Sequence, residues 1–371
     1  MKILALIPEA FGGHGGISCY DTDLLTALSL HPSCQRITFL TRSAMRRVQD
    51  LPPKLQPIPV DSESTLEYIA HSLKFGIFFD LDFVFCGHLH LLPLAYTISR
   101  MRSVPLVVAL YGIEAWQPTP RRWVNLLASK PDHFLSISRF TANKFLQWAR
   151  ISKDHISVLP NAVHLERFGL GPKTEKLVER YRLKGKRVLL TLGRLMEEER
   201  YKGIDEVMEL LPLLRKKISN LVYLIVGDGS DRVRLEKKAD ALGILDIVCF
   251  AGAISEEEKA DHYRLADAFV MAGKGEGFGF VFLEAMACGI PVVASRLDGS
   301  REAVLNGKLG LIADPRNPDN LLECLFTALG KRKDIPAGLE YFSFENFVLR
   351  THTFLEKFLK KGSDERGRRA A

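Results

Sequence analysis

Short apolar runs alternate along the chain with segments whose apolar residues recur every three or four positions. In the first half, the runs predict strands at 2–7, 36–41, 82–87, 105–112, 133–138 and 156–161. After a polar stretch the pattern starts again, and it predicts strands at 187–193, 221–227, 246–252, 268–273, 290–295 and 309–314. Strands that alternate with helices are typical of βα units around a parallel sheet. The pattern therefore predicts an α/β protein with two successive doubly wound domains.

The length of 371 residues also favours two domains, because single hydrophobic cores stop growing at about 250–300 residues. We place the first domain at 1–168, a polar linker at 169–186 and the second domain at 187–342. Ligands of doubly wound sheets bind beyond the carboxyl ends of the strands. Two such domains that face each other predict a site in the cleft between them.

The last part of the chain predicts a long helix followed by a tail. Residues 343–361 are amphipathic, and residues 362–371 predict a disordered basic tail. The residues expected to contact a domain are Phe347, Leu349, Phe354, Leu355 and Phe358.

Composition and cysteine spacing are those of a cytosolic globular protein. Hydrophobic residues make up 47% of the chain and charged residues 26%. The six cysteines include no C-x-x-C pair, which favours reduced thiols over a disulfide framework or a zinc site. No apolar run reaches the ~18 residues of a membrane span, and the N-terminus has no secretory signal pattern. We therefore expect a cytoplasmic location.

The net charge of +7 favours anionic partners. Basic clusters at 42–49, at 120–123 and in the tail suggest peripheral contact with the inner face of an anionic membrane, although a solvated surface explains them equally well. No recognition helix, zinc knuckle or aromatic-basic platform accompanies the charge, so we expect no nucleic-acid partner.

The segment GKGEGFGFVFLEAMACGIPVVAS, residues 273–295, combines a glycine-rich turn, two carboxylates and an apolar strand. A glycine turn that opens a helix presents free N–H groups and the positive end of a helix dipole, which suits a phosphate. Glu276 in the turn and Glu284 two helical turns later cannot bind an anion, but they can accept hydrogen bonds from hydroxyls. A nucleotide-sugar offers both phosphates and hydroxyls; the alternative is a solvent-facing loop and helix surface.

Three further turns are candidates for ligand contact. Arg194 follows a strand that ends at Gly193, and Lys202 precedes the next helix, so the pair predicts a diphosphate clamp. The loop at 11–18 contains Gly15 and Gly16 at a helix start, but it lacks a G-x-G-x-x-G fingerprint. Gly227 follows another strand and predicts a tight turn with a ligand contact. Solvated basic residues and purely structural glycines remain the alternatives.

Several of these motifs together resemble the retaining glycosyltransferases of family 4, which have the GT-B fold. The resemblance is carried in the second half by GRL with a following KG, LIVGDG, FAGAISEEE, the E-x7-E spacing within 273–295 and GLIADPRNPDNL. The first half matches more loosely, through the glycine loop, ISRFTANKF and VLPNAVHLERF. The resemblance implies two Rossmann-like domains that face across a cleft, with the C-terminal helix crossing back to the first domain.

The resemblance also implies roles for individual residues. Arg194 and Lys202 would hold the donor diphosphate, and Glu284 would bind the ribose hydroxyls. Glu276 would contact sugar hydroxyls near the reacting carbon. The glycines and backbone groups implied on the donor side are Gly15, Gly16, Gly193, Gly227, Gly277, Phe278 and Gly279.

One departure from the family pattern concerns the acceptor side. Many members carry His-Gly where this chain has Tyr111 and Gly112, so an imidazole role cannot be transferred, and we expect Tyr111 to donate a hydrogen bond there instead. His14 and His88 are further acceptor-side candidates, with a structural role as the alternative.

Two D-x-D pairs raise the question of a metal. Asp21 and Asp23 fall inside a predicted helix, where positions i and i+2 point apart. Asp80 and Asp82 lead directly into a strand. We expect both pairs to be surface or capping residues, and we predict neither a metal nor a cofactor, because Arg194 and Lys202 can offset the charge of a leaving diphosphate.

The sequence thus predicts a retaining, metal-independent transferase that moves a hexosyl group from a UDP- or GDP-sugar to an acceptor hydroxyl. The acceptor would be a saccharide or a lipid-linked molecule in polysaccharide, lipopolysaccharide or glycolipid biosynthesis. The alternatives are a nucleotide-sugar epimerase of similar fold and a non-catalytic nucleotide-sugar-binding protein. A nicotinamide oxidoreductase is disfavoured by the missing dinucleotide fingerprint.

Overall fold

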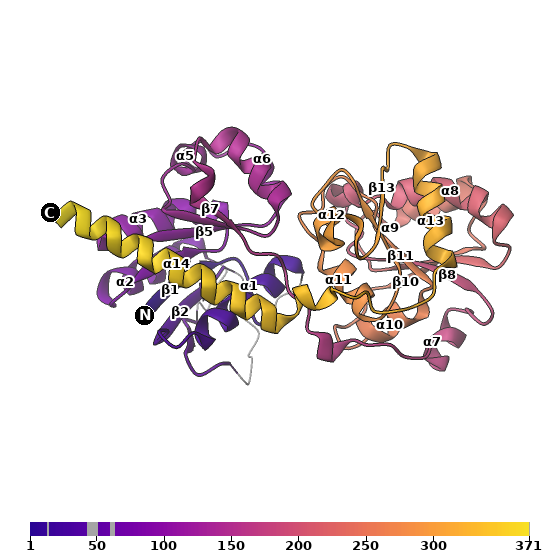
Figure 1. Cartoon of the computed structure of the whole chain (residues 1–371). Coiled ribbons are helices and arrows are strands. Elements are labelled where there is room, and N and C mark those ends of the chain that lie inside the picture. Colours follow the sequence, from indigo (N-terminus) through magenta and orange to yellow (C-terminus); the bar gives the residue numbers. More distant parts are fainter. Residues whose placement is uncertain (13–14, 43–50, 60–63, 371) are drawn as a thin grey trace. The chain divides into compact units, whose positions relative to one another are not determined.

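The computed structural model describes residues 1–12, 15–42, 51–59 and 64–370, with side chains up to residue 360. The chain divides into two compact units (Figure 1). Unit 1 comprises Met1–Ala162 together with Phe344–Ala371, and unit 2 comprises Val163–Ser343. Each unit is built around its own parallel sheet.

Within the described residues, unit 1 holds a seven-stranded sheet in the order β3-β2-β1-β4-β5-β6-β7, with every neighbouring pair parallel. The five inner strands are buried on both faces, which explains their continuous apolar runs, whereas the edge strands β3 and β7 are partly exposed. Their bounds are β1 (Lys2–Ile7), β2 (Arg36–Thr41), β3 (Leu55–Pro57), β4 (Phe83–Cys86), β5 (Leu106–Leu110), β6 (His133–Ser136) and β7 (Ile156–Val158).

The helices of unit 1 follow local start signals. Ser138 caps α6 by accepting a hydrogen bond from the Thr141 N–H at 3.1 Å, and Pro93 lies in the first turn of α3. The helices are α1 (Gly16–Leu30), α2 (Thr65–Phe78), α3 (Leu92–Arg102), α4 (Ile113–Trp116), α5 (Arg122–Leu127), α6 (Arg139–Ala149) and α14 (Phe344–Ala370), with 3₁₀ helices η1 (Leu89–Leu91) and η2 (Lys153–His155).

Unit 2 holds a six-stranded parallel sheet in the order β10-β9-β8-β11-β12-β13. The strands are β8 (Arg187–Leu192), β9 (Leu221–Val226), β10 (Val248–Gly252), β11 (Ala268–Val270), β12 (Val292–Ser295) and β13 (Leu311–Ala313). The helices are α7 (Glu175–Arg180), α8 (Ile204–Lys217), α9 (Arg232–Ala241), α10 (Lys259–Leu265), α11 (Phe280–Ala287), α12 (Ser300–Ala303) and α13 (Pro318–Gly330), with 3₁₀ helices η3 (Leu165–Arg167), η4 (Glu197–Lys202), η5 (Leu305–Gly307) and η6 (Leu339–Phe342).

Both sheets reverse their strand order at one point, between β1 and β4 in unit 1 and between β8 and β11 in unit 2. This is the doubly wound arrangement, and ligands bind beyond the carboxyl ends of the strands on either side of the reversal. The predicted α/β class and all twelve predicted strands are confirmed. The sequence analysis missed β3, a three-residue edge strand whose LQP sequence is too short and too rich in proline to give a strand pattern.

The boundaries of unit 2 lie outside those expected from the sequence. The Val163 N–H donates to the Phe342 carbonyl at 2.8 Å, so the chain enters and leaves unit 2 at adjacent points. The segment 169–186, expected to be a linker, contains α7, and the buried Leu177 anchors it. Arg264 also donates to the Gly169 carbonyl at 3.0 Å, so this polar segment is packed into unit 2.

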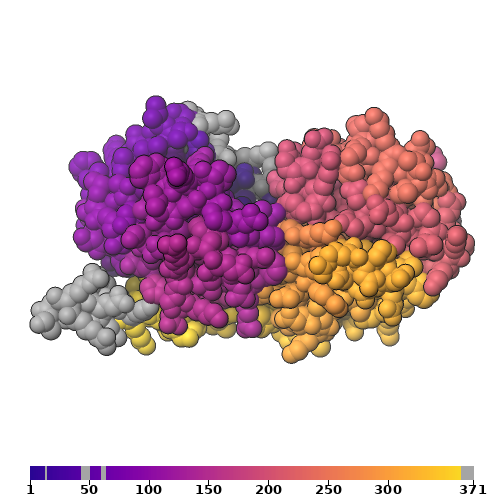
Figure 2. Space-filling model, turned by 90° about the horizontal axis from the view of Figure 1, so that it is seen from above, coloured from indigo at the N-terminus to yellow at the C-terminus, as the bar shows by residue number. Residues whose placement is uncertain are grey.

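The C-terminal helix α14 packs on unit 1, as expected, and lies beside α1 (Figure 1). It appears in yellow along one edge of unit 1 in the space-filling view (Figure 2). Phe347, Thr351 and Leu355 form its fully buried stripe, and the His352 ring nitrogen Nε2 lies 2.9 Å from the Ala27 carbonyl. Leu349, expected to be a contact residue, is 63% exposed, so that prediction was wrong. The helical backbone extends to Ala370, through residues expected to be disordered.

Among the described residues, no helix has the length and apolar character that a membrane-spanning segment needs.

Replacement of Phe347 by Ala tests the packing of α14. The ring is fully buried and meets the Tyr20 ring edge-on at 5.8 Å between centroids. We expect Phe347→Ala to lower the free energy of unfolding of unit 1 by about 3–5 kcal/mol. The matched control is Leu349→Ala on the exposed face, which should stay within about 0.5 kcal/mol of the parent. Equal effects of the two substitutions in urea denaturation would contradict the packing described here.

Candidate active site

The carboxyl end of β8 is packed backbone to backbone against the end of β9. The Gly193 N–H donates to the Val226 carbonyl at 2.9 Å. A Cβ atom on Gly227 would lie only 1.9 Å from the Gly193 carbonyl oxygen, so a side chain cannot be placed there. Gly227 therefore has a packing role at this edge of the sheet, and Gly193 is held directly beside it.

Arg194 and Lys202, the predicted diphosphate clamp, are brought together on one carboxylate. Arg194 pairs with Oε1 of Glu199, and the Lys202 ammonium lies 2.6 Å from Oε2 of the same residue. Lys202 also donates to the Arg194 carbonyl at 3.3 Å. The Arg194 side chain is 67% exposed, whereas Glu199 and Lys202 are largely buried. The sequence analysis missed Glu199, because one glutamate within EEER carries no signal of its own.

The loop after β11 is fastened to the segment after β8 through Tyr201. The Lys274 N–H donates to the Tyr201 carbonyl at 2.7 Å. A Cβ atom on Gly273 would lie 2.2 Å from that carbonyl oxygen, and one on Gly275 would lie 2.4 Å from the Tyr201 ring. These two glycines of the GKGEGFG turn thus permit close packing of the two loops. This contact places the turn beside Lys202.

Glu276 lies half-buried in this turn. Burial first, and then the charge of Asp298, raise the pKa of its carboxyl to about 7, while Lys202 acts in the opposite direction. The Phe278 N–H donates weakly to its Oε1 at 3.5 Å. The carboxyl therefore changes its charge near neutral pH, and it lies within the electrostatic reach of the cation cluster.

Asp298 holds the GKGEGFG turn in place through its backbone. It is fully buried, and its carboxylate accepts hydrogen bonds from the Glu276 N–H at 3.0 Å and from the Ser300 hydroxyl at 2.6 Å. The Gly299 N–H donates to the Glu276 carbonyl at 2.8 Å. The sequence analysis missed Asp298, although the DGS triplet after a predicted strand is a recognisable turn signal.

Helix α11 begins at this turn without a side-chain cap. Its N-cap residue is Gly279, at φ 92°, and its first turn carries no acidic residue. Phe278 is buried and packs against Phe342, with ring centroids 5.5 Å apart, so that only its backbone faces the turn. Gly277 contributes its carbonyl to a tight contact with Gly299. The N-terminus of α11 thus provides positive potential beside Glu276.

Glu284 lies in the second turn of α11, and its side chain is only 11% exposed. The Tyr263 hydroxyl donates to its Oε2 at 2.6 Å, and the Lys259 ammonium lies 3.2 Å from its Oε1. Both partners belong to α10, and the sequence analysis missed them. A carboxylate offers about four acceptor positions, so two of them are left for a ligand.

The glycine loop of unit 1 lies at the carboxyl end of β1. Gly15 is the N-cap residue of α1, at φ 100°, and Gly16 is the first residue of that helix. No side chain caps this end, and a Cβ atom on Gly15 would meet nothing within 4 Å, so the turn is open. His14, an acceptor-side candidate, lies outside the described residues.

Tyr111 does not present its hydroxyl to a ligand. The residue is buried directly after β5, and its hydroxyl donates to Oδ1 of Asp21 at 2.5 Å. Burial, followed by the neighbouring Asp21, raises the pKa of the phenol well above its usual value. The expectation that Tyr111 donates a hydrogen bond on the acceptor side was therefore wrong: its donor is already used inside the core.

His88 lies at the carboxyl end of β4, half-buried beside His90. Its Nδ1 accepts a hydrogen bond from the His90 N–H at 3.1 Å, which leaves the ring proton on Nε2. Burial first, and then His90 and Arg121, lower the pKa of His88 to about 4. His88 is thus a neutral hydrogen-bond donor at neutral pH.

The two D-x-D pairs have different environments. Asp21 and Asp23 are buried in α1, so the expectation of surface or capping residues was wrong for this pair. Asp80 and Asp82 are exposed, and Asp82 accepts a hydrogen bond from the Lys2 N–H at 2.6 Å. Among the residues that the structure describes, no group of three His, Cys, Asp or Glu side chains is arranged to hold a metal ion.

Two family models and several known proteins match the chain. The model for glycosyl transferases group 1 matches residues 173–334, and the model for Glycosyltransferase Family 4 matches residues 32–167. A GDP-mannose-dependent alpha-(1-6)-phosphatidylinositol monomannoside mannosyltransferase of Mycolicibacterium smegmatis is 33% identical over 263 residues, 68% of this chain and 67% of that protein. A D-inositol 3-phosphate glycosyltransferase of Geodermatophilus obscurus is 29% identical over 260 residues, 67% of this chain and 56% of that protein. The matches thus span between half and about two thirds of these relatives.

Solved structures agree on the fold. Sucrose-phosphate synthase of Thermosynechococcus elongatus superimposes with a TM-score of 0.77 at 18% identity, over 97% of this chain and all of that one. HepE of Anabaena in complex with UDP-glucose gives a TM-score of 0.75 at 19% identity, over 96% of this chain and all of that one.

The chain has the GT-B fold of glycosyltransferases. It combines two doubly wound units, an uncapped helix N-terminus after β11 and a C-terminal helix that packs on unit 1. The chain belongs to glycosyltransferase family 4.

The raised pKa of Glu276 predicts a pH-dependent gain in stability from Glu276→Gln. The unfolded carboxyl ionises near its ordinary pKa of 4.5 and the folded one near about 7, so the parent protein loses stability as the pH rises between these values. Glu276→Gln cannot ionise, and we expect it to be more stable than the parent at pH 8 by at most about 3 kcal/mol, with the difference vanishing near pH 4.5.

Urea denaturation at pH 4.5, 6 and 8 without ligand measures this difference. Glu198→Gln, at an exposed neighbouring position, is the control and should show no comparable trend. A Glu276→Gln protein that is less stable than the parent at pH 8 would contradict the raised pKa.

Proposed function

We propose that this protein transfers a hexosyl group from a nucleoside diphosphate sugar to an acceptor hydroxyl, with retention at the anomeric carbon. The observation that carries the proposal is the cluster at the carboxyl ends of β8 and β11. Arg194 and Lys202 share the Glu199 carboxylate there, and the charges of Glu199 and Lys202 both act on the Glu276 carboxyl. Two cations beside a carboxyl that changes its charge near neutral pH suit a diphosphate joined to a sugar.

In the proposed reaction the bond between the anomeric carbon and the diphosphate oxygen breaks, and the electron pair stays with the diphosphate. The acceptor oxygen forms the new bond to that carbon and loses its proton. Arg194, Lys202 and the N-terminus of α11 would stabilise the negative charge that develops on the leaving group. Because these groups already offset that charge, the proposal needs no metal ion.

The two glutamates of the E-x7-E spacing would have separate tasks. Glu276 would accept hydrogen bonds from sugar hydroxyls, and its negative form would attract the positive charge that develops on the sugar ring. Glu284 would accept hydrogen bonds from the ribose hydroxyls through the positions that Tyr263 and Lys259 leave open. Backbone groups of Gly193, Gly227, Gly277, Phe278 and Gly279 would line the donor site in unit 2.

Both UDP- and GDP-sugars are candidate donors. The M. smegmatis relative is named as GDP-mannose-dependent, and the Anabaena structure contains UDP-glucose. The acceptor would be a saccharide or a lipid-linked molecule, in polysaccharide, lipopolysaccharide or glycolipid biosynthesis. The relatives described above include transferases to a phosphatidylinositol mannoside and to inositol phosphate, and no epimerase is among them.

A thermal-shift panel of UDP, GDP, ADP and dTDP with their sugars tests the donor site. A nucleotide present at 100 times its Kd stabilises the folded protein by about 2.7 kcal/mol, which corresponds to a shift of about 3 °C or more. We expect one nucleotide to give such a shift in the presence of EDTA. The shift should be lost in Lys202→Ala and in Glu284→Gln.

Lys216→Ala, at an exposed position in the last turn of α8, is the matched control and should keep the full shift. No shift with any nucleotide would refute the proposed function. A shift that EDTA abolishes would refute the metal-independent clamp alone.

We also propose that unit 1 makes peripheral contact with anionic membranes through α5. Trp123 and Leu126 lie one turn apart on this helix and are 75% and 64% exposed, and Arg122 lies beside them. Exposed aromatic and aliphatic side chains next to cations are typical of interfacial membrane binding. Most of the basic cluster at 42–49 lies outside the described residues, and the side chains of the tail at 362–371 are not described either.

Vesicle sedimentation tests this contact. We expect binding to vesicles that contain anionic phospholipid, weaker binding as salt rises from 0.05 to 0.5 M, and roughly tenfold weaker binding for Trp123→Ser. Leu213→Ser, an exposed apolar residue on α8, is the control and should bind like the parent. Absence of binding at low salt would refute the contact.

A further inference from the structure

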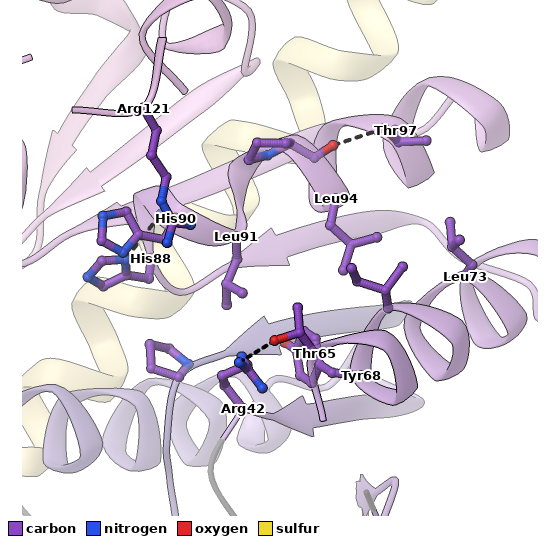
Figure 3. A pocket seen from close by; sticks show the side chains of 13 residues that line it. Arg42, Thr65, Tyr68, Leu73, His88, His90, Leu91, Leu94, Thr97 and Arg121 are labelled. Carbon is purple, nitrogen blue, oxygen red and sulfur yellow. Dashed lines mark hydrogen bonds between the residues drawn. The ribbon is translucent and has the colours of Figure 1, made fainter. Parts of the chain in front are cut away.

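Unit 1 contains a pocket of about 700 Å³ at the carboxyl edge of its sheet (Figure 3). This volume is in the range of small-molecule sites. The pocket opens beside β1 and β4, where the strand order of unit 1 reverses. Its lining residues follow β1, β2 and β4 or belong to α2, α3 and the residue before α5: Pro8, Arg42, Thr65, Tyr68, Ile69, Leu73, His88, His90, Leu91, Pro93, Leu94, Thr97 and Arg121.

The packing of α2 against α3 explains where the pocket lies. A Cβ atom on Gly76 would lie 2.5 Å from Cγ2 of Ile98, so the two helices are in tight contact toward their C-terminal ends. The lining residues of both helices precede this contact in the sequence. The tight contact therefore closes the pocket at the far end, and the space opens toward the carboxyl edge of the sheet.

The pocket wall has two chemically different parts. Leu73 of α2 and Leu94 of α3 form the apolar end of the pocket, on the right in Figure 3. Leu91 lies between this end and the opposite end, where His88 and His90 lie. At that other end Arg121 points toward His88 and His90. None of the thirteen lining residues is acidic.

Two arginines line the pocket: Arg42 lies beside Thr65 and Tyr68, and Arg121 lies beside His88 and His90 (Figure 3). Arg42 donates to the Thr65 hydroxyl at 2.7 Å, and its guanidinium lies over the Tyr68 ring at 6.0 Å. Arg121 forms no ion pair with any carboxylate of the described residues, so its charge is not offset there. His88 adds a neutral N–H donor, because its Nδ1 is occupied by the His90 N–H.

We propose that this pocket binds the acceptor as the phosphate ester of a long-chain lipid, with the phosphate at Arg121 and His88 and the chain along Leu73 and Leu94. The planar guanidinium of Arg121 matches phosphate geometry, and the apolar part of the same pocket matches a hydrocarbon chain. A neutral saccharide would leave the guanidinium charge of Arg121 without an anion. Inorganic phosphate would leave the apolar wall exposed to water. The acceptor role rests on the proposed function, whereas the binding of the lipid phosphate itself does not.

Calorimetric titration of the full chain with octyl, decyl and dodecyl phosphate, below their aggregation concentrations, tests the pocket. Each buried methylene contributes a factor of about four in affinity, so we expect up to roughly fifteenfold tighter binding for every two carbons added. Dodecyl maltoside has the same chain without the charge and should bind at least tenfold more weakly than dodecyl phosphate. Inorganic phosphate alone should bind more weakly still.

Two substitutions separate the charged end from the apolar end. Arg121→Gln should weaken dodecyl phosphate about tenfold and leave dodecyl maltoside unchanged. Leu94→Gln should weaken both ligands. Arg150→Gln removes the same charge from an exposed residue of unit 1 that lies outside the pocket and outside α5, and it should bind dodecyl phosphate like the parent. Equal affinity for inorganic phosphate and dodecyl phosphate, or equal effects of Arg121→Gln and Arg150→Gln, would overturn the proposal.

The thermal-shift panel of nucleotides, measured on the same variants, distinguishes the lipid-phosphate pocket from the proposed transferase function. Arg121→Gln should keep the full nucleotide shift, because the donor site lies in unit 2. Chain-length-dependent binding of alkyl phosphates without any nucleotide shift would uphold the pocket and refute the transferase. A nucleotide shift without alkyl phosphate binding would refute the pocket alone.

Discussion

The candidate active site depends on the contact between Tyr201 and the turn after β11. Tyr201 belongs to the segment that follows β8, and its carbonyl and ring fit against Gly273 and Gly275 at distances that no side chain would permit. The contact joins two loops that come from the strands on either side of the reversal in strand order. Lys202, the next residue, is thereby brought within electrostatic reach of Glu276. Without this contact the two motifs would be separate turns on one sheet edge.

The charges of the site form a connected set around this contact. Two cations that would otherwise repel each other are held on Glu199, and a buried Asp298 fixes the Glu276 backbone while raising the pKa of its side chain. Such perturbed carboxyls are common in active sites, because burial and like charges that cost stability also tune reactivity. The exposure of Arg194 is consistent with a side chain that can exchange Glu199 for a phosphate.

Unit 1 has a different electrostatic character from unit 2. Its buried polar pair, Tyr111 and Asp21, uses its hydrogen bond internally, and Oδ2 of Asp21 has no partner among the described residues. The imidazole of His88 and the guanidinium of Arg121 instead face a pocket with an apolar wall. The donor-side candidates of unit 2 are thus accompanied by carboxylates, whereas none of the described residues that line the pocket of unit 1 is acidic. This difference suits a nucleotide-sugar with many hydroxyls in one unit and an anionic apolar molecule in the other.

The sequence by itself determined the α/β class, the two sheets, the long terminal helix and the turns that carry Arg194, Lys202, Glu276 and Glu284. Helices, strands and glycine turns depend mainly on residues that are close in the sequence. They leave periodic patterns of apolar residues and glycines, so they can be predicted from the sequence. Only the tertiary structure decided that Glu199 joins the two cations, that Asp298 stands behind Glu276, and that Tyr263 and Lys259 hold Glu284. It also decided that Tyr111 turns into the core toward Asp21, 90 positions away. These contacts depend on how elements pack, and packing between distant segments leaves no spacing pattern in a single chain.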